Sequence, residues 1–273
     1  MTLDSLARVS CVGAGKMGGA LVEGWLARGL KPQALTLIDP APPDAIAALA
    51  RRSGIRLLTA PPEDETAGVL LLAVKPQIMG KVLTGLSAHV GADTLVLSIA
   101  AGKTIADIAS SLAVPAAVIR AMPNTPAAIG LGMTVLVADR RTREAQRQVA
   151  SALMQAVGET AWIDDEALMD AVTAVSGSGP AYVFHLAECL AAAGEEAGLP
   201  AEVAAQLARQ TVAGAGGLLA ASPDDAATLR RNVTSPGGTT EAALQVLMTD
   251  DGLAPLLRRA VEAAVRRGRE LSG

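Results

Sequence analysis

The chain of 273 residues has few aromatic side chains, few cysteines and few histidines. Only 1% of its residues are aromatic, so no platform of stacked rings for nucleic-acid bases is expected. A formal net charge of -4 also argues against a phosphate-backbone partner. The two cysteines, Cys11 and Cys189, and the two histidines, His89 and His185, form neither a disulfide framework nor a metal-ligand pattern. We therefore expect a reducing compartment, no metal and no nucleic-acid partner.

Long apolar runs are also missing. No run approaches the roughly 18 residues that a membrane-spanning helix needs, and no basic region followed by an apolar segment opens the sequence. We therefore expect a cytoplasmic protein with no membrane partner. The sequence is nevertheless 51% hydrophobic, and its apolar residues are mostly Ala, Leu and Val. Small apolar side chains favour closely packed helices and buried parallel strands.

The first recognisable motif is a strand, a glycine-rich turn and a helix. A β-rich run, residues 8–12, leads into Gly13, Ala14, Gly15, Lys16, Met17 and Gly18. In a dinucleotide-binding fingerprint Gly13 makes the tight turn, Gly15 lets a pyrophosphate approach the backbone, and Gly18 lets the helix pack on the strand. The alternative is a glycine-rich turn that binds no ligand.

Asp39 bears on which dinucleotide the chain prefers. It ends a second predicted strand, residues 35–38, where a carboxylate accepts hydrogen bonds from ribose hydroxyls. A 2′-phosphate would bring about 1.5 to 2 negative charges against it. No Lys or Arg occurs from Pro32 through Ala50, so we predict that NADH is used at least as well as NADPH. The alternatives are a solvent-facing turn at Asp39-Pro40, or a basic side chain such as Arg51 or Arg52 that folds back.

Short strands and amphipathic helices continue to alternate as far as residue 163. The further predicted strands are residues 55–58, 69–74, 94–99, 118–121, 133–138 and 160–163. This alternation predicts an α/β Rossmann-type doubly wound, mostly parallel sheet, whose ligands lie at the carboxyl ends of the strands. Three of these strand ends are followed by unusual segments: Lys75-Pro76, Ala100-Ala101-Gly102, and the residues from Met122 to Pro126. Lys75 could instead be a solvated lysine, and Asn124 a turn former.

After Ile163 every periodic segment is helical. We therefore predict two domains, a dinucleotide-binding domain of residues 1–163 and an all-α domain of residues 164–273. Ser176-Gly177-Ser178-Gly179-Pro180 interrupts this region before a helix from Ala181 to about Ala197. Such an interruption is either a second set of exposed N–H groups at a helix start or a linker that binds nothing.

A second loop in the helical half, residues 232–244, combines Pro236 and two glycines with a helix start. Gly237-Gly238 leaves the backbone bare, and Thr239 or Thr240 is expected to cap the following helix. The positive end of that helix would suit a small carboxylate. The alternative is an ordinary helix-loop-helix corner.

Together these segments resemble the pyrroline-5-carboxylate reductase family along the whole chain. The resemblance rests on residues 13–18, 73–76, 119–126, 176–182 and 232–244. It implies reduction of the cyclic imine 1-pyrroline-5-carboxylate to L-proline by NAD(P)H, the last step of proline biosynthesis. It also implies a helical domain that interlocks with a second subunit, as a homodimer or a larger assembly of dimers. The glycine-rich loop after residue 232 and the Ser176-Gly177 motif are its family-specific parts.

The resemblance also implies roles for individual residues. The substrate carboxylate and ring nitrogen would be held by Ser235, Gly238, Thr239 and Thr240, with Glu166 beside that pocket. The cofactor would contact Ala73, Val74, Lys75, Pro76, Ile99, Ala100 and Ala101. Asn124 is a further candidate for a cofactor contact because it follows a strand end at the same crevice. Thr240 is the candidate catalytic residue. Two positions depart from the family pattern: Ala60 stands where an asparagine is frequent, and Asp39-Pro40 replaces Ser or Asn followed by Arg.

Two other functions remain open from the sequence. A β-hydroxyacid dehydrogenase or a related imine reductase shares the strand-glycine-helix start, but the former uses a lysine in its helical domain. This chain has no lysine after Lys103. A dinucleotide-binding regulatory protein without catalysis is the alternative outside the enzymes, and the polar loops of the helical half argue against it.

Overall fold

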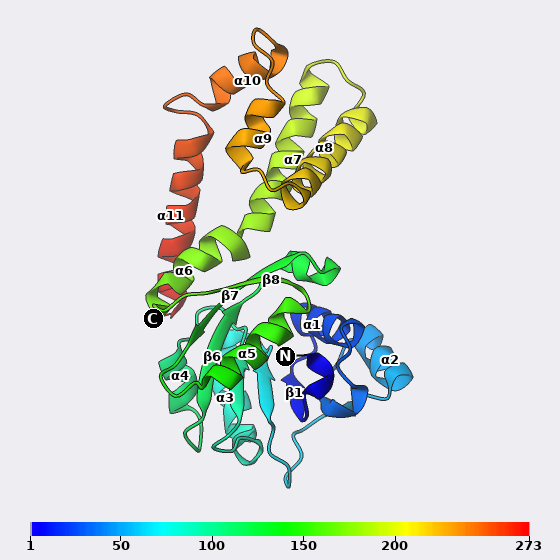
Figure 1. Cartoon of the computed structure of the whole chain (residues 1–273), viewed down its shortest axis with the longest axis vertical. Coiled ribbons are helices and arrows are strands. Elements are labelled where there is room, and N and C mark those ends of the chain that lie inside the picture. Colours follow the sequence, from blue (N-terminus) through cyan, green and yellow to red (C-terminus); the bar gives the residue numbers. More distant parts are fainter. Residues whose placement is uncertain (1, 273) are drawn as a thin grey trace. The chain divides into compact units, whose positions relative to one another are not determined.

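The computed structural model describes residues 2–272, and the chain divides into two compact units (Figure 1). One unit comprises Met1–Gly177 with Val265–Gly273, and the other comprises Ser178–Ala264. The division into domains after residue 163 stays a prediction. Within the described residues, no helix is both long enough and apolar enough to cross a bilayer.

The first unit contains an eight-stranded sheet with the order β3-β2-β1-β4-β5-β6-β7-β8. The strands are β1 (Val9–Val12), β2 (Leu35–Ile38), β3 (Arg56–Leu58), β4 (Val69–Leu72), β5 (Leu95–Ser98), β6 (Ala117–Met122), β7 (Gly132–Ala138) and β8 (Gly158–Trp162). All neighbouring pairs are parallel except β6 and β7, which are antiparallel. The predicted mostly parallel sheet is therefore confirmed. The strand order reverses between β1 and β4, where ligands bind in folds of this type.

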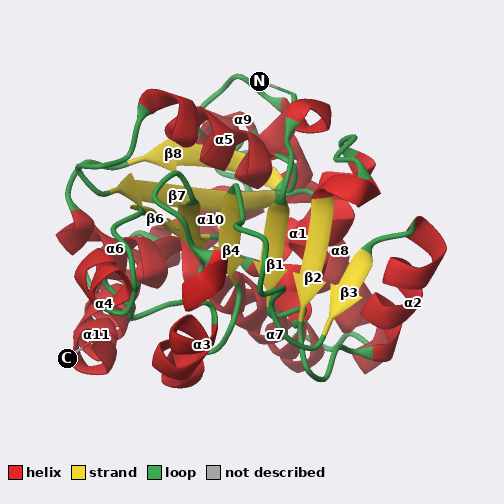
Figure 2. Cartoon of the chain, turned by 90° about the horizontal axis from the view of Figure 1, so that it is seen from below, coloured by secondary structure: helices red, strands yellow, loops and turns green. Residues whose placement is uncertain are grey.

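Helices cover both faces of this sheet, which makes it doubly wound as predicted. The helices of the first unit are α1 (Lys16–Ala27), α2 (Asp44–Ser53), α3 (Met79–Gly85), α4 (Ile105–Ser110), α5 (Glu144–Gln155) and α6 (Met169–Val172). One buried cluster joins the sheet to α1, α2 and α5, and a second joins its other face to α3 and α4 (Figure 2). Strands β1, β4 and β5 are buried along their full lengths, because helices lie on both sides of them.

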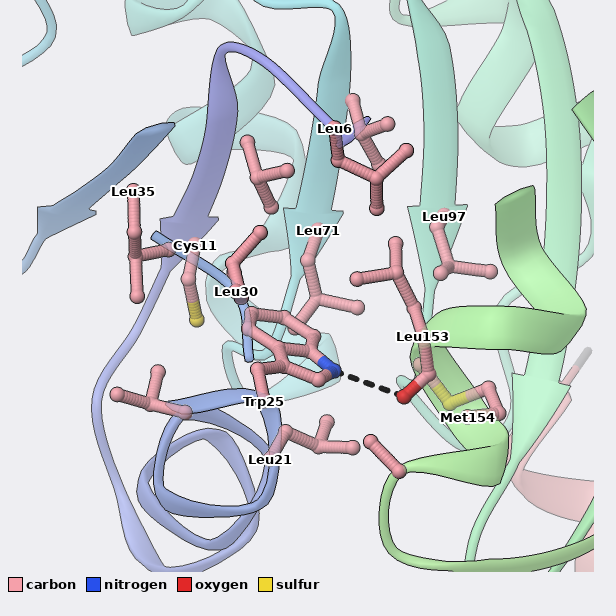
Figure 3. Close-up of a cluster of buried hydrophobic side chains, with 14 of the residues drawn as sticks. Leu6, Cys11, Leu21, Trp25, Leu30, Leu35, Leu71, Leu97, Leu153 and Met154 are labelled. Carbon is pink, nitrogen blue, oxygen red and sulfur yellow. Dashed lines mark hydrogen bonds between the residues drawn. The ribbon is translucent and has the colours of Figure 1, made fainter. Parts of the chain in front are cut away.

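Trp25 is the largest fully buried side chain of the first cluster (Figure 3). It projects from α1, and its indole Nε1 donates a 2.8 Å hydrogen bond to the carbonyl oxygen of Leu153 in α5. Leucines of the strands, among them Leu35, Leu71 and Leu97, belong to the same cluster. The indole N–H thus finds a partner inside the core, as a buried tryptophan requires. This contact ties α1 and α5 to the same face of the sheet.

The second unit is entirely helical. Its elements are α7 (Gly179–Glu196), α8 (Ala201–Ala221), α9 (Ala226–Asn232), α10 (Thr239–Leu247) and most of α11 (Leu253–Ser272). Helices α7 and α8 pack closely, and a Cβ on Gly194 would lie 3.2 Å from the Ala204 methyl group. Of residues 178–264 only Ala204 and Ala208 are buried, whereas large apolar side chains such as Phe184, Leu207 and Leu218 are exposed. A single copy of this unit therefore buries little of its apolar surface.

Candidate functional site

The glycines of the turn between β1 and α1 have different surroundings. Gly13 has a φ of 89°, and a Cβ on it would lie 2.7 Å from the Ala73 carbonyl oxygen. A Cβ on Gly18 would lie 2.3 Å from the Gly13 carbonyl oxygen. Gly15 is different, because a Cβ on it would meet no atom within 4 Å and the residue is exposed. Packing within the chain therefore explains Gly13 and Gly18 but does not explain Gly15.

The surroundings of Gly15 fit a phosphate group. Gly15 precedes α1, and no side chain caps this helix start, so its first N–H groups can bind an anion. A cavity of about 240 Å³ borders the turn and is lined by Ala14, Gly15, Lys16, Gly19, Ala20, Glu23, Pro43, Ile46 and Ala128. This arrangement favours the dinucleotide-binding interpretation over a turn that binds nothing. The contacts of Met17 and the other turn residues with a cofactor stay a prediction.

Gly15→Ala and Gly18→Ala should separate cofactor binding from folding. Gly15 has a φ of -65°, which alanine tolerates, so Gly15→Ala should fold normally but weaken cofactor binding by about tenfold or more because its methyl group occupies the open space. Gly18→Ala should instead lower the free energy of unfolding by about 1 to 3 kcal/mol. Urea titration and cofactor titration of both variants measure the two effects. Unchanged cofactor affinity in Gly15→Ala would contradict the phosphate interpretation.

Asp39 lies at the carboxyl end of β2, and its carboxylate holds the glycine turn. Its Oδ2 accepts a 2.7 Å hydrogen bond from the Ala14 N–H, and its Oδ1 accepts one of 2.9 Å from the Ala41 N–H. The side chain is therefore fixed by the turn and does not merely start a turn that faces solvent. Burial, and secondarily the negative charge of Asp39, raise the pKa of the neighbouring Cys11 thiol to about 12. Cys11 is thus an inert part of the core.

The ends of β4 and β5 lie beside the glycine turn. The Ala73 N–H donates to the Val12 carbonyl oxygen, and the Ile99 N–H donates to that of Leu72. Val74, Pro76 and Ala100 share this edge of the sheet with them, and Lys75 and Ala101 are exposed there. Within residues 2–272 Lys75 forms no ion pair, so the solvated-lysine interpretation stays open beside the predicted cofactor contact.

Asn124 follows the end of β6 and bonds to protein groups on both sides of its amide. Its Oδ1 accepts a 2.9 Å hydrogen bond from the Met133 N–H, and its Nδ2 lies 3.3 Å from both the carbonyl oxygen and the Oγ of Ser176. The residue therefore does more than form a turn, because it joins the β6 end to a distant segment. Its predicted contact with the cofactor stays a prediction. Ser176 was not predicted from the sequence as the partner of Asn124.

Glu166 is bonded within the first unit. Its Oε1 forms a 2.5 Å ion pair with the Arg120 guanidinium and accepts a 2.7 Å hydrogen bond from the Ile105 N–H at the start of α4. The Arg120 side chain is only 9% exposed, whereas that of Glu166 is 29% exposed. The role of Arg120 was not predicted from the sequence, although a charged residue in the middle of a buried strand signals a hidden partner. A substrate contact by Glu166 stays a prediction.

The loop between α9 and α10 belongs to the second unit. Helix α9 ends at Asn232, Gly237 has a φ of 69°, and α10 begins at Thr239 after the cap residue Gly238. The expectation that Thr239 or Thr240 caps this helix is wrong, because both threonines lie inside it and neither makes a capping bond. The Glu241 carboxylate instead accepts a 2.7 Å hydrogen bond from the Gly237 N–H. That bond holds the bare glycine backbone in place.

The hydroxyl groups of this loop fall into two kinds. The Thr234 hydroxyl donates a 2.7 Å hydrogen bond to the Arg230 carbonyl oxygen, so it stabilises the end of α9. Ser235, Thr239 and Thr240 are exposed, and among residues 2–272 their hydroxyls have no hydrogen-bond partner. These three side chains are therefore available to a ligand, and their predicted contact with the substrate stays a prediction. An ordinary helix-loop-helix corner does not require three such hydroxyls.

Two family models match the chain. The model described as "Pyrroline-5-carboxylate reductase dimerisation" matches residues 166–271, and the one described as "NADP oxidoreductase coenzyme F420-dependent" matches residues 8–102. The chain is 40% identical to the pyrroline-5-carboxylate reductase of Pseudomonas aeruginosa over 98% of both chains. It is 38% identical to that of Pasteurella multocida over 95% of this chain and 96% of the relative.

Solved structures give the same result. A pyrroline-5-carboxylate reductase from Coxiella burnetii superposes with a TM-score of 0.90 at 34% identity. The superposition covers 98% of this chain and 100% of the Coxiella burnetii chain. The Plasmodium falciparum pyrroline carboxylate reductase, solved with NADP bound, superposes with a TM-score of 0.80 at 26% identity over 98% of both chains. Both likenesses extend over the sheet and over the helical half.

Proposed function

The chain belongs to the pyrroline-5-carboxylate reductase family, and from this premise we propose which of its residues carry out the reduction of 1-pyrroline-5-carboxylate by NAD(P)H. The observation that carries the proposal is the contrast between occupied and free hydroxyls in the loop of residues 232–244. Thr234 serves the fold, whereas Ser235, Thr239 and Thr240 lie exposed beside the bare backbone of Gly238. These four groups hold the substrate carboxylate and ring nitrogen.

The reaction requires little from side chains other than positioning. When bound, the reduced nicotinamide supplies the hydride that the cyclic imine carbon accepts. The glycine turn and Asp39 hold the nucleotide, and the segments after β4, β5 and β6 orient its reactive end. Rate enhancement then comes mainly from holding an already electrophilic, protonated imine in place. This explains why the sequence shows no Ser-His-Asp or paired-carboxylate arrangement.

Thr240 is the residue proposed to contact the substrate ring nitrogen. Thr240→Ala should lower kcat/KM by about 10- to 150-fold, because a hydrogen bond to a charged group contributes about 1.5 to 3 kcal/mol. Thr249→Ala is the matched control, since its hydroxyl already donates 2.9 Å to the Val246 carbonyl oxygen at the other end of α10. Initial rates of imine-dependent NAD(P)H oxidation measure both variants. An unchanged rate in Thr240→Ala would remove this residue from the mechanism.

The helical half matches a dimerisation domain, so the chain assembles with other copies. We propose a homodimer or a larger assembly of dimers, supported by the exposed apolar side chains of α7 and α8. Sedimentation at micromolar protein should give at least a dimer, and a folded, active monomer would contradict this. We also propose a cytoplasmic location, supported by two free cysteines, Cys11 and Cys189.

A further inference from the structure

The segment that leads into α7 contains an unusual turn. Thr173–Gly177 forms a π-helical turn directly after α6. Such turns are rare in proteins as a whole, and those that do occur are often found at functional sites. This turn lies against the carboxyl end of β6, since a Cβ on Gly177 would come within 2.6 Å of the Met122 Cε atom. The backbone of Ser176 and Gly177 is therefore brought to the edge of the sheet where ligands bind.

The Ser176 carbonyl group lacks its usual helical partner. The residue four positions later is Pro180, which has no N–H to donate. The next N–H, that of Ala181, already donates 3.0 Å to the Ser178 carbonyl oxygen. Asn124 replaces the missing donor, because its Nδ2 lies 3.3 Å from the Ser176 carbonyl oxygen. Asn124 thus satisfies the carbonyl group that Pro180 leaves without a helical donor.

Asn124 also determines what the Ser176 hydroxyl can do. The Met133 N–H can only donate, so the amide atom 2.9 Å from it must be the Asn124 oxygen, and the NH₂ group must face Ser176. The Ser176 Oγ accepts from this NH₂ group at 3.3 Å. The hydroxyl hydrogen of Ser176 then has no acceptor among residues 2–272. Ser176 is left as a hydrogen-bond donor to something that the chain does not supply.

The position and the polarity of this donor select its partner. Asp39 and the glycine turn bind the adenosine half on the β2 side of the switch point, so the nicotinamide half extends over β4, β5 and β6. The unpaired hydroxyl hydrogen needs an acceptor, which the N–H of a protonated imine is not, and the substrate carboxylate is proposed to bind at Ser235 and Thr239. The carbonyl oxygen of the nicotinamide carboxamide is an acceptor in the right half of the crevice.

Building on the proposed function, we propose that Ser176 donates a hydrogen bond to the carboxamide oxygen of the nicotinamide ring. Asn124 is the positioning residue that orients the Ser176 hydroxyl for this role. Ser176→Ala should therefore weaken binding of the reduced cofactor by about 2- to 12-fold, the range for a neutral hydrogen bond. Asn124→Asp should have a similar effect, because an aspartate accepts the Ser176 hydrogen and withdraws it from the cofactor.

Equilibrium binding tests this without any turnover. NADH, NADPH and their thionicotinamide analogues, in which a weakly accepting sulfur replaces the carboxamide oxygen, are titrated against each protein. The unmodified protein should bind the normal cofactor more tightly than the analogue, and Ser176→Ala should lose this discrimination. Thr173→Ala is the control in the same turn, because its hydroxyl already donates 2.8 Å to the Met169 carbonyl oxygen. It should keep the discrimination.

The outcomes separate two claims. If the unmodified protein shows no discrimination between oxygen and sulfur, or if a folded Ser176→Ala variant retains it, the assignment of Ser176 is overturned. The first of these measurements needs no variant, so it decides even where Ser176→Ala fails to fold. If the unmodified protein binds neither NADH nor NADPH, the proposed function itself fails.

Discussion

Glu166→Ala should lower the free energy of unfolding of the first unit by about 3 to 5 kcal/mol, the usual range for removing one partner of a buried ion pair. The variant leaves the Arg120 guanidinium, which is only 9% exposed, without its partner. It also leaves the Ile105 N–H at the start of α4 without its acceptor. Urea titration followed by tryptophan fluorescence measures the effect, because both tryptophans, Trp25 and Trp162, lie in the first unit.

Arg120→Met should be much milder, less than about half as destabilising. It removes the buried charge itself, and the remaining Glu166 side chain is 29% exposed and keeps its bond to the Ile105 N–H. The order of the two variants is therefore the informative result. If Arg120→Met destabilises the unit as much as Glu166→Ala does, the loss reflects packing and not an unpaired buried charge.

Asp39 should make the enzyme use NADH at least as well as NADPH. At about 4 Å, two unit charges repel by roughly 1 kcal/mol in water and about 4 kcal/mol near a protein surface, or a few-fold to several hundred-fold in affinity. The carboxylate cannot simply turn away from a 2′-phosphate, because it accepts hydrogen bonds from both Ala14 and Ala41. Asp39→Ser should therefore raise the kcat/KM for NADPH relative to that for NADH.

Asp44→Ser is the matched control for this substitution. Asp44 is an exposed carboxylate in the first turn of α2. The substitution Asp44→Ser removes the same charge as Asp39→Ser but leaves the glycine turn intact. It should change the cofactor ratio much less than Asp39→Ser does. Asp39→Ser also loses two hydrogen bonds to backbone N–H groups, which can lower the rate with either cofactor. The measurement is therefore the kcat/KM for NADPH divided by that for NADH, and not either rate alone. A strong preference of the unmodified enzyme for NADPH would show that a basic side chain reaches this site.

Local patterns were enough to predict the architecture. The eight strands follow from short apolar runs, and the turn at Gly13 follows from glycine spacing, because both depend on residues that are neighbours in the sequence. The substrate role of Ser235, Thr239 and Thr240 was predicted from the resemblance of this loop to a known family, and it stays a prediction. The predicted cap of α10 was wrong by one residue, because Gly238 takes the cap position and the Glu241 carboxylate accepts a hydrogen bond from the Gly237 N–H.

What could not be predicted is the pairing of residues far apart in the chain. Arg120 and Glu166 are separated by 46 residues, and Asn124 and Ser176 by 52. No local rule connects them, because their contact depends on how β6, α4 and the turn before α7 pack together. A partial signal exists in each case: a charge inside a buried strand, and a proline four residues after a carbonyl group in a helix.

The most direct test is an initial-rate assay with purified protein, 1-pyrroline-5-carboxylate, and either NADH or NADPH. Oxidation of the cofactor should depend on the imine and should yield L-proline in equal amount. The kcat/KM with NADH should equal or exceed that with NADPH, because the Asp39 carboxylate is held at the glycine turn proposed to bind the nucleotide and no Lys or Arg lies between residues 32 and 50. Absence of imine-dependent oxidation with both cofactors would contradict the account.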